Sequence, residues 1–395
     1  MKLNPPKIKL KKLGYLETFL TVVVLGGLTT ILYLYTSGYR LNNNKDKGVI
    51  DINKTGMISV KSLPTGASVS LDDELRTATD DTVSGIKPGI HSLKIIKKGF
   101  VEWTKNIEVF EQLVTDITAV LVSQSPRLEP LTNTGAKHPS VSPTLSKLAY
   151  FSFDSEKPGI WVIPLTGSGI GLFRTNPTIA IQDTLFTKYS IGEEITWSPD
   201  EKSLLIRVPG NVYYLVNLET NTAQTTLRMD QILKDWEEQL AEKRSIFMTP
   251  LLNVPQEIKT LALSSDVVWA PDEKKFLFTK QNGNNLEYRV YNFENPIPVG
   301  EKVETLVFTT DINNPQPKIS WYSDSFHLIL AEGDIEKENK GIISLIRIDG
   351  TNKTEIYNNT LYSDLAFSTP SGDKVIILTS FKSGGQTDLY TIGIR

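Results

Sequence analysis

The sequence predicts a mainly β protein that begins with one transmembrane helix, and three observations lead to this fold class. An uncharged apolar run near the N-terminus is long enough to cross a membrane. Short stretches that alternate apolar and polar residues follow it, and a turn phrase then recurs along the last two-thirds of the chain. We therefore expect an N-terminal helix, a small β-sandwich-like domain and a β-propeller of five or six blades with one inserted helix.

Residues 18–39 form the expected transmembrane helix. No charged side chain lies between Glu17 and Arg40, and an α-helix of this length covers the ~30 Å hydrocarbon core of a bilayer. A cleaved signal peptide is the competing interpretation, but its apolar core is shorter, roughly 7–15 residues, and ends at a small-residue cleavage site. Here tyrosines and Arg40 end the run, as at a membrane interface. The sequence favours an uncleaved anchor.

The charges that flank this helix predict its orientation. The first twelve residues carry five lysines and no acidic residue, so residues 1–17 are expected to be a basic cytoplasmic tail. Residues 40–395 are then extracytoplasmic, and the polar residues 40–55 are expected to form a stalk. The chain contains no cysteine, which excludes disulfides and a lipid-modified cysteine anchor. The outer domains must be stabilised by buried cores.

The composition offers no sign of a cofactor, a metal or a catalytic centre. The net charge is −3, which does not suggest a nucleic-acid partner. His91, His138 and His327 lie in different repeats or domains, whereas a zinc site needs three or four convergent ligands. The Gly-x-Ser-x-Gly motif of α/β-hydrolases is absent from the sequence. We therefore expect no catalytic, metal-binding or cofactor-binding residues.

Residues 56–123 read as short alternating strands separated by turns. The motifs with the most regular spacing in this segment are Ser62-x-Pro64-x-Gly66-Ala67, Leu71-Asp72, Pro88-Gly89-x-His91 and Lys98-Gly99-Phe100-x-x-Trp103. In order and spacing they resemble the PEGA domain, a small β-sandwich-like module of cell-surface proteins. Thr65 replaces the glutamate for which the family is named. The resemblance implies an adhesive or scaffolding module without an active site.

Two aromatic residues of this segment are candidates for ligand contact. Phe100 and Trp103 could stack on sugar rings if they were exposed. The alternative is that both side chains plug one end of the sandwich, and the sequence favours this packing role.

Residues 124–395 contain a recurring phrase in which an aromatic or apolar residue is followed by a Ser-Pro-Asp-like turn and then by an apolar strand. The copies are Val141-Ser142-Pro143-Thr144, Trp197-Ser198-Pro199-Asp200, Trp269-Ala270-Pro271-Asp272, Trp321-Tyr322-Ser323-Asp324 and Phe367-Ser368-Thr369-Pro370. Three or four strands per copy predict propeller blades, in which the aromatic residue packs between neighbouring blades. The copies resemble the WD40-like repeats of TolB-like propellers, although glutamate replaces the usual glycine at Glu201 and Glu273.

The spacing of the copies leaves two further elements to place. Met229–Arg244 explains the longest gap, because Met229, Ile232, Leu233, Trp236 and Leu240 share one helical face. This helix is expected to cover a hydrophobic edge, with partner docking as the alternative. The last copy shows only three strands, so we expect residues 127–132 to supply the missing outer strand. A sixth blade without the phrase could lie near residues 245–265.

Together these patterns resemble single-pass bacterial envelope proteins that combine a PEGA domain with a TolB-like propeller. They predict a non-enzymatic binding or scaffolding protein in the plasma membrane, with the propeller face as its recognition surface. An envelope protein or cell-wall glycan is the expected partner. The alternative function is an envelope sensor or assembly factor, which would need a membrane partner because only about 17 residues precede the helix. A glycan hydrolase is the third hypothesis and would require two carboxylates to converge in the propeller funnel.

Overall fold

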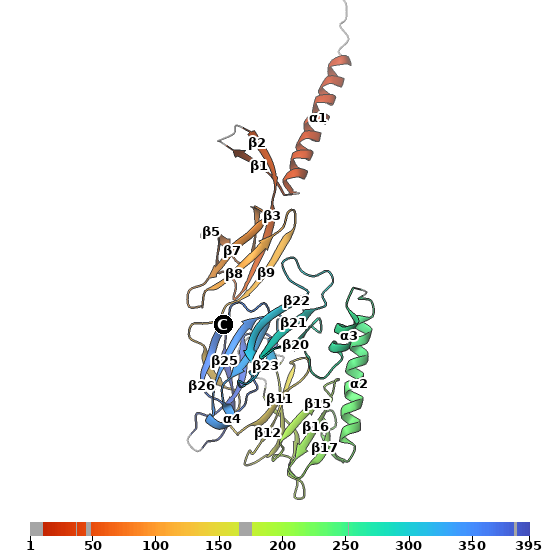
Figure 1. Ribbon diagram of the computed structural model, residues 1–395, viewed down its shortest axis with the longest axis vertical. Helices are drawn as coiled ribbons and strands as arrows, with labels where there is room; N and C mark the ends of the chain where they lie inside the picture. The colour runs from red at the N-terminus through yellow and green to blue at the C-terminus, as the bar shows by residue number, and fades with distance from the viewer. Residues whose placement is uncertain (1–10, 37, 45–48, 166–175, 252, 383–384) are drawn as a thin grey trace, which may run out of the picture. The chain divides into compact units, whose positions relative to one another are not determined.

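The computed structural model describes residues 11–36, 38–44, 49–165, 176–251, 253–382 and 385–395. It divides into two compact units, each considered by itself below (Figure 1). The first unit comprises Met1–Ile95, Asn106–Ala119 and Pro298–Gly300. The second comprises Ile96–Lys105, Val120–Ile297 and Glu301–Arg395.

The apolar run up to Thr36 lies in helix α1 (Lys11–Thr36). The helix differs in its bounds from the expected residues 18–39, because it begins within the predicted tail and Tyr39 already belongs to a strand. Its segment Glu17–Thr36 is long and apolar enough to span a membrane, with a mean hydropathy of 1.8 and none of it buried in protein. Threonine hydroxyls inside the run donate hydrogen bonds to carbonyls four residues earlier, as Thr29 does to Leu25 at 2.6 Å. These bonds satisfy polar groups that lipid could not. Of the predicted tail, residues 1–10 lie outside the described residues.

The predicted stalk contains regular structure. Strands β1 (Tyr39–Asn44) and β2 (Val49–Lys54) pair antiparallel, from Tyr39 opposite Lys54 to Asn44 opposite Val49. Composition does not reveal this hairpin, because its backbone pairing needs no apolar alternation.

The predicted β-sandwich-like segment forms two sheets. One has the order β6-β3-β9, with β6 (Asp81–Ile86), β3 (Gly56–Leu63) and β9 (Val114–Val120). The other has the order β5-β4-β7-β8, with β5 (Glu74–Ala78), β4 (Ser68–Leu71), β7 (Gly89–Ile96) and β8 (Trp103–Val109). Alternate residues of β3 such as Ile58 and Val60 are fully buried, as are Val69 in β4 and Leu93 in β7. The period of two read from the sequence therefore marks the core-facing positions.

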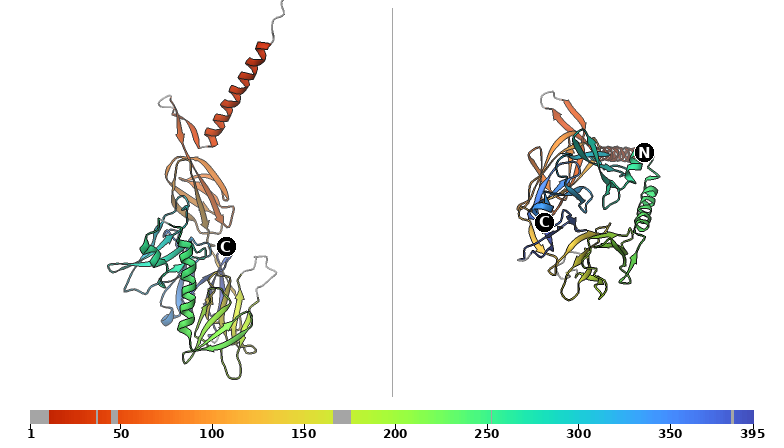
Figure 2. Two further views of the ribbon diagram at one scale, coloured as in Figure 1. Left: turned by 90° about the vertical axis from the view of Figure 1, so that its right-hand side faces the viewer. Right: turned by 60° about the horizontal axis from the view of Figure 1, so that its bottom comes forward.

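Among the described residues, the second unit contains five four-stranded antiparallel sheets, which we call blades 1 to 5 (Figures 1 and 2). Blade 1 is β11 (Lys137–Val141), β12 (Lys147–Ser152), β13 (Gly159–Pro164) and β14 (Thr178–Gln182). Blade 2 is β15 (Glu194–Trp197), β16 (Ser203–Val208), β17 (Val212–Asn217) and β18 (Thr222–Thr226). Blade 3 is β19 (Val268–Trp269), β20 (Lys275–Asn282), β21 (Asn285–Asn292) and β22 (Glu304–Asp311). Blade 4 is β23 (Lys318–Trp321), β24 (His327–Glu332), β25 (Lys340–Arg347) and β26 (Thr354–Thr360).

Blade 5 is completed by a strand from earlier in the chain. Its order is β10-β29-β28-β27, with β10 (Arg127–Pro130), β29 (Asp388–Gly393), β28 (Lys374–Thr379) and β27 (Phe367–Ser368). Arg127 lies opposite Gly393, and Pro130 lies opposite Tyr390. The prediction that residues 127–132 supply the missing outer strand is confirmed. Buried side chains of this sheet, including Ile376 and Leu389, pack with Leu148 and Tyr150 of blade 1.

The recurring phrase forms the turn between the first and second strands of every blade. The backbone φ is positive at an equivalent residue of all five turns, between +55° and +60°: Leu145, Glu201, Glu273, Ser325 and Gly372. Glycine favours this left-handed conformation, so these residues stand where the TolB-like repeat has its glycine.

One copy of the phrase needs a correction of one residue. Ser368 pairs with Val375 just as Trp197 pairs with Leu204, so Ser368, and not Phe367, occupies the aromatic position of blade 5. Phe367 is buried one residue earlier. The sequence prediction placed this copy by its aromatic residue, Phe367. Because Phe367 lies directly before the equivalent position Ser368, the predicted copy was shifted by one residue.

Tryptophan side chains join neighbouring blades. The indole Nε1 of Trp197 in blade 2 donates to the Ser140 carbonyl of blade 1 at 3.0 Å, and that of Trp321 in blade 4 donates to the Val268 carbonyl of blade 3 at 2.8 Å. Each tryptophan thus bonds to the first strand of the preceding blade while its ring packs in the core between the two.

Two helices lie between blades 2 and 3 in the chain, and one of them accepts the tryptophan hydrogen bond that a preceding blade accepts elsewhere. The predicted helix is α2 (Met229–Met248), and its expected apolar face is half-buried. Helix α3 (Gln256–Ala262) occupies the stretch where a sixth blade was considered. Trp269 of blade 3 donates to the Ala262 carbonyl of α3 at 3.0 Å. Helix α3 therefore provides the acceptor that the first strand of the preceding blade provides for Trp197 and Trp321. The right view of Figure 2 shows the blades and α2 around a common centre.

Candidate functional site

A pocket of about 610 Å³, which we call the funnel, opens at one end of the blades, and its volume is in the range of small-molecule pockets. All its lining residues belong to the second unit, and most lie where the chain enters the first strand of blade 1, 2 or 5. The funnel is lined by His138, Pro139, Ser140, Glu193, Glu194, Ile195, Ile335, Asn339, Tyr362, Ser363, Asp364 and Leu365.

Blade 1 contributes a histidine in a constrained conformation. His138 has a φ of +45°, and its register break in β11 turns the residue out of the regular ladder. Its ring meets Phe151 edge-on, with ring centroids 6.3 Å apart. Partial desolvation, followed by the charge of Lys137, lowers the pKa of His138. The imidazole is therefore neutral at pH 7, since an ordinary histidine has a pKa of about 6.5.

Blade 2 contributes two adjacent carboxylates. Glu193 and Glu194 accept hydrogen bonds from the same guanidinium, that of Arg207, with 3.1 Å between Arg207 Nε and the Glu194 carboxylate. Both glutamate side chains remain accessible, at 41% and 59% exposure. Each carboxylate therefore keeps lone pairs that face solvent in the funnel.

The opposite wall comes from blades 4 and 5. Asp364 lies in the connection that leads into β27, with Lys318 Nζ 3.9 Å from its carboxylate. The Leu365 N–H donates to the Ser363 hydroxyl at 3.1 Å, which fixes the turn of this connection. The short helix α4 (Ile335–Glu338) and the residue after it add Ile335 and Asn339.

Exposed apolar side chains lie in the connection from β14 to β15, which leads to the funnel residue Glu193. They are Leu185, Phe186 and Ile191, which we call the apolar rim. Leu185 and Phe186 are 95% and 97% exposed. Large apolar side chains that are exposed together are typical of an interaction surface.

Neither of the candidate ligand-facing residues, Phe100 and Trp103, is exposed in the structure. Trp103 is only 3% exposed, and Phe100 is half-buried with its backbone bridged to Ser123. Neither residue lines the funnel. Their burial agrees with the packing role that the sequence favoured.

The repeat residues lie in the turns and between blades, away from the funnel lining. The three aspartates share one contact: Asp200, Asp272 and Asp324 each accept a hydrogen bond from the backbone N–H two residues later. Pro199 and Pro271 precede two of these aspartates in the same turns. Such contacts stabilise tight turns.

The sequence reasoning missed the funnel residues, although a positional signal was present. His138, Glu194 and Leu365 each lie three residues before the aromatic position of a blade, which is Val141, Trp197 and Ser368 respectively. An alignment of the copies extended three or four residues upstream would have brought these funnel residues of blades 1, 2 and 5 to equivalent positions.

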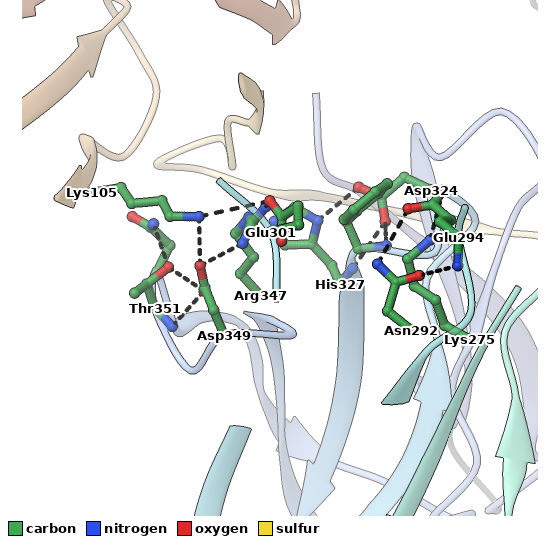
Figure 3. Close-up of polar contacts among 12 residues, drawn as sticks. Lys105, Lys275, Asn292, Glu294, Glu301, Asp324, His327, Arg347, Asp349 and Thr351 are labelled. Atoms are coloured by element: carbon green, nitrogen blue, oxygen red, sulfur yellow. Dashed lines mark hydrogen bonds and ion pairs between the residues drawn. The ribbon is translucent and has the colours of Figure 1, made fainter. Parts of the chain in front are cut away.

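A second cluster of charged residues is buried in the same unit, as Figure 3 shows. Asp349 contacts Arg347 and lies 2.7 Å from Lys105 Nζ, while Glu301 contacts the other side of Arg347. Burial alone would raise the pKa of Asp349, but the charges of Arg347 and Lys105 outweigh it and hold that pKa far below its usual range. The side chains of this cluster are 5% to 18% exposed, so we assign it to the stability of the fold and not to a binding surface.

Lys275 and Glu294 in Figure 3 belong to another group of charged residues in the same unit. Lys275 is fully buried and lies 2.9 Å from Asp272 and 3.3 Å from Glu294. Its Nζ also sits 4.2 Å from the centre of the Phe326 ring. Within the described residues, no group of three or more His, Asp or Glu side chains is arranged to hold a metal ion.

Comparisons with known proteins place one segment of the chain in a family. No curated protein sequence matches the chain. Among solved structures it is similar to TolB from Acinetobacter baumannii, with 15% identity, a TM-score of 0.26, and coverage of 77% of this chain and 59% of that one. Oligogalacturonate lyase from Vibrio parahaemolyticus has 11% identity, a TM-score of 0.32, and coverage of 87% and 99%.

At these TM-scores the architecture rests on the strand pairing of the chain itself. The chain spans less than two-thirds of the Acinetobacter TolB structure. Residues 55–125 match the PEGA domain family, as the motifs between Ser62 and Trp103 predict.

Proposed function

We propose that this chain is a single-pass membrane protein of the bacterial cell envelope that binds a partner, without chemistry on it, through the funnel face of its blades. The observation that carries the proposal is the funnel itself, because connections from several blades of a rigid scaffold converge there on one accessible cavity. Helix α1 supports an anchor, and the PEGA domain supports an extracytoplasmic location for residues 40–395.

A binding role suits the carboxylates of the funnel better than hydrolysis. A glycosidase needs one carboxyl group that carries a proton and a second that is charged. Glu193 and Glu194 instead accept hydrogen bonds from one guanidinium, which suits a pair of charged acceptors. In the alternative function, an envelope sensor or assembly factor, the same surface would bind the partner. The difference is that a membrane protein would then carry out the signalling or assembly step.

The test is site-specific crosslinking in cells. A photoreactive amino acid replaces Ser363 in the funnel of the full-length protein, and a matched variant carries it at Thr220 in the turn between β17 and β18, at the other end of blade 2. We expect a discrete crosslinked product from position 363 and none from position 220. Equal products from both positions, or none from either, would exclude the funnel as the recognition surface.

The partner class is tested in the same cells. Digestion of the crosslinked product with a cell-wall hydrolase distinguishes a wall glycan from an envelope protein. A product whose mass falls to that of the chain after this digestion contains glycan, and a product that resists it and yields peptides of a second protein by mass spectrometry identifies a protein partner. A membrane protein in the product would favour the sensor or assembly role.

A further inference from the structure

We propose that the funnel binds a cationic segment of a polypeptide, with lysine or arginine side chains in the funnel and an apolar side chain on the apolar rim. This inference rests on the proposed function and adds the chemistry of the partner. It follows from the charge of the lining and from the exposed side chains of the apolar rim.

The lining of the funnel is acidic. It includes the carboxylates of Glu193, Glu194 and Asp364 but no lysine or arginine. Arg207 and Lys318 contact these carboxylates from outside the lining. Lys137 lines an adjoining pocket that shares His138, Tyr362 and Ser363 with the funnel. The carboxylates are 41% to 59% exposed, so each can still accept hydrogen bonds from a ligand. An arginine or lysine of a partner meets charge complementarity here.

The apolar rim is held in a fixed conformation before any partner arrives. In the turn that carries Leu185 and Phe186, the Thr184 N–H donates to the Thr187 carbonyl at 2.9 Å, and the Thr187 N–H donates to the Thr184 hydroxyl at 3.0 Å. Asp183 accepts at the base of the turn from the N–H and the hydroxyl of Ser190, at 2.9 and 2.8 Å. The exposed pair is thus preorganised, and covering it with an apolar group releases roughly 25 cal/mol per Å².

A polypeptide fits this combination better than a lipid surface does. Bacterial and other membranes carry anionic headgroups that attract basic protein surfaces, whereas the funnel presents carboxylates. A polypeptide segment can carry basic and apolar side chains a few residues apart and so meet both features. A lipid surface remains an outcome of the test.

The experiment measures binding of a defined probe to the full-length protein in nanodiscs of neutral phosphatidylcholine. The probe is a fluorescent twelve-residue peptide that alternates lysine with leucine and phenylalanine, and its counterpart has glutamine in place of every lysine. By fluorescence anisotropy we expect the lysine peptide to bind roughly tenfold more tightly at low salt. The difference should shrink as the salt concentration rises, because salt screens exposed charges. Empty nanodiscs measure binding to lipid.

Two sets of variants locate the binding. The triple variant Glu193→Gln, Glu194→Gln and Asp364→Asn should lose roughly tenfold in affinity for the lysine peptide. The matched control is Glu74→Gln, Glu219→Gln and Glu238→Gln, which removes three ion-paired but exposed carboxylates elsewhere and should bind as the parent does. Leu185→Ser with Phe186→Ser should weaken both peptides severalfold.

The peptide measurements test the cationic segment, whereas the crosslinking experiment tests whether the funnel binds a partner at all. Equal affinity for the lysine and glutamine peptides, or equal losses in the funnel and control triple variants, would overturn the cationic segment. Binding of the lysine peptide to empty nanodiscs that matches binding to the protein would overturn it in favour of lipid. If position 363 still crosslinks a partner after such a result, the funnel is a recognition surface for other chemistry.

Discussion

Glu201 joins the turn of blade 2 to the turn of blade 1 through Thr144. Its carboxylate accepts hydrogen bonds from the backbone N–H and from the hydroxyl of Thr144, each at 2.7 Å, and a third from Ser146 at 2.7 Å. Burial alone would raise the pKa of Glu201, but these hydrogen bonds outweigh it and lower that pKa. A residue that replaces a glycine thus contributes a contact between blades that glycine could not make.

The substitution Glu201→Gly should therefore destabilise the protein, although glycine favours the positive φ of this position. Glu201→Gly relieves a φ of +57°, worth ~1 kcal/mol, but removes an ionised acceptor of three hydrogen bonds, which contribute ~1.5–3 kcal/mol each. We expect a net loss of at least ~3 kcal/mol in the free energy of unfolding, measured by urea denaturation with circular dichroism.

Glu273 provides the matched control. Its φ is +55°, but its carboxylate contacts only the exposed Lys243, and such pairs contribute ~0–1 kcal/mol. Glu273→Gly should leave stability unchanged or raise it by up to ~1 kcal/mol. If both variants lose the same free energy, the contact between Glu201 and Thr144 has no stabilising role.

The buried charge cluster predicts a pH-dependent effect. Asp349→Asn removes the carboxylate that faces Lys105 and Arg347 and should cost ~3–5 kcal/mol at pH 7. Because the folded-state pKa of Asp349 is lowered, its contribution is fully present above the unfolded-state pKa of about 3.9. It begins to fall below that pH and is lost as the pH falls through the folded-state pKa.

The same variant therefore tests the electrostatic origin of that contribution. Denaturation between pH 7 and pH 3 should show the parent losing its advantage over Asp349→Asn below about pH 4. Glu219→Gln, in an exposed pair with Lys202, should change stability by less than ~1 kcal/mol. An advantage of the parent that stays constant down to pH 3 would contradict the assigned cause.

Two buried tryptophans differ in one hydrogen bond. Trp197 Nε1 donates to the Ser140 carbonyl, whereas Trp103 Nε1 is a buried donor without a partner among the described residues. Replacement by phenylalanine leaves an unpaired acceptor in the first case and removes an unpaired donor in the second. Trp197→Phe should therefore cost ~1–3 kcal/mol more than Trp103→Phe. A cavity of about 10 Å³ beside Trp103 is near the size of one water, and a larger loss at Trp103 would show that a water bonds the indole.

The absence of cysteine makes membrane topology directly measurable. A single cysteine at Asn4 or at Ser363 creates one reactive thiol per chain, because the natural sequence has none. With N-terminal lysines in the cytoplasm, a membrane-impermeant maleimide should label intact spheroplasts at position 363 and not at position 4. Permeabilised spheroplasts should be labelled at both. Labelling of position 4 alone in intact spheroplasts would reverse the orientation.

The sequence was most informative where physics leaves few choices. An uncharged run of membrane length predicted α1, and the cost of an unpaired sheet edge predicted that Arg127–Pro130 would pair with the last strand, as it does. The helix predicted from Met229 is α2. These features depend on local periodicity or on a single rule of sheet pairing.

The funnel could not be predicted in the same way. His138, Glu193 and Asp364 are far apart in the chain and meet only through the order of the blades. A histidine or glutamate before a strand is also common on any solvated edge, so its type alone indicates no site. The paired strands β1 and β2 escaped prediction for a related reason, since their pairing needs no pattern of apolar residues.

The pairing of β10 with β29 also constrains how the protein is made. Thr391 donates to the Glu129 carbonyl across 262 positions of sequence. At a synthesis rate of roughly 5–20 residues per second, β10 emerges on the order of tens of seconds before β29 exists. During that interval blade 5 has no strand to accept β10, and an unpaired edge invites association with other chains. The sheet of blade 5 can therefore close only after the last strand of the chain has been synthesised.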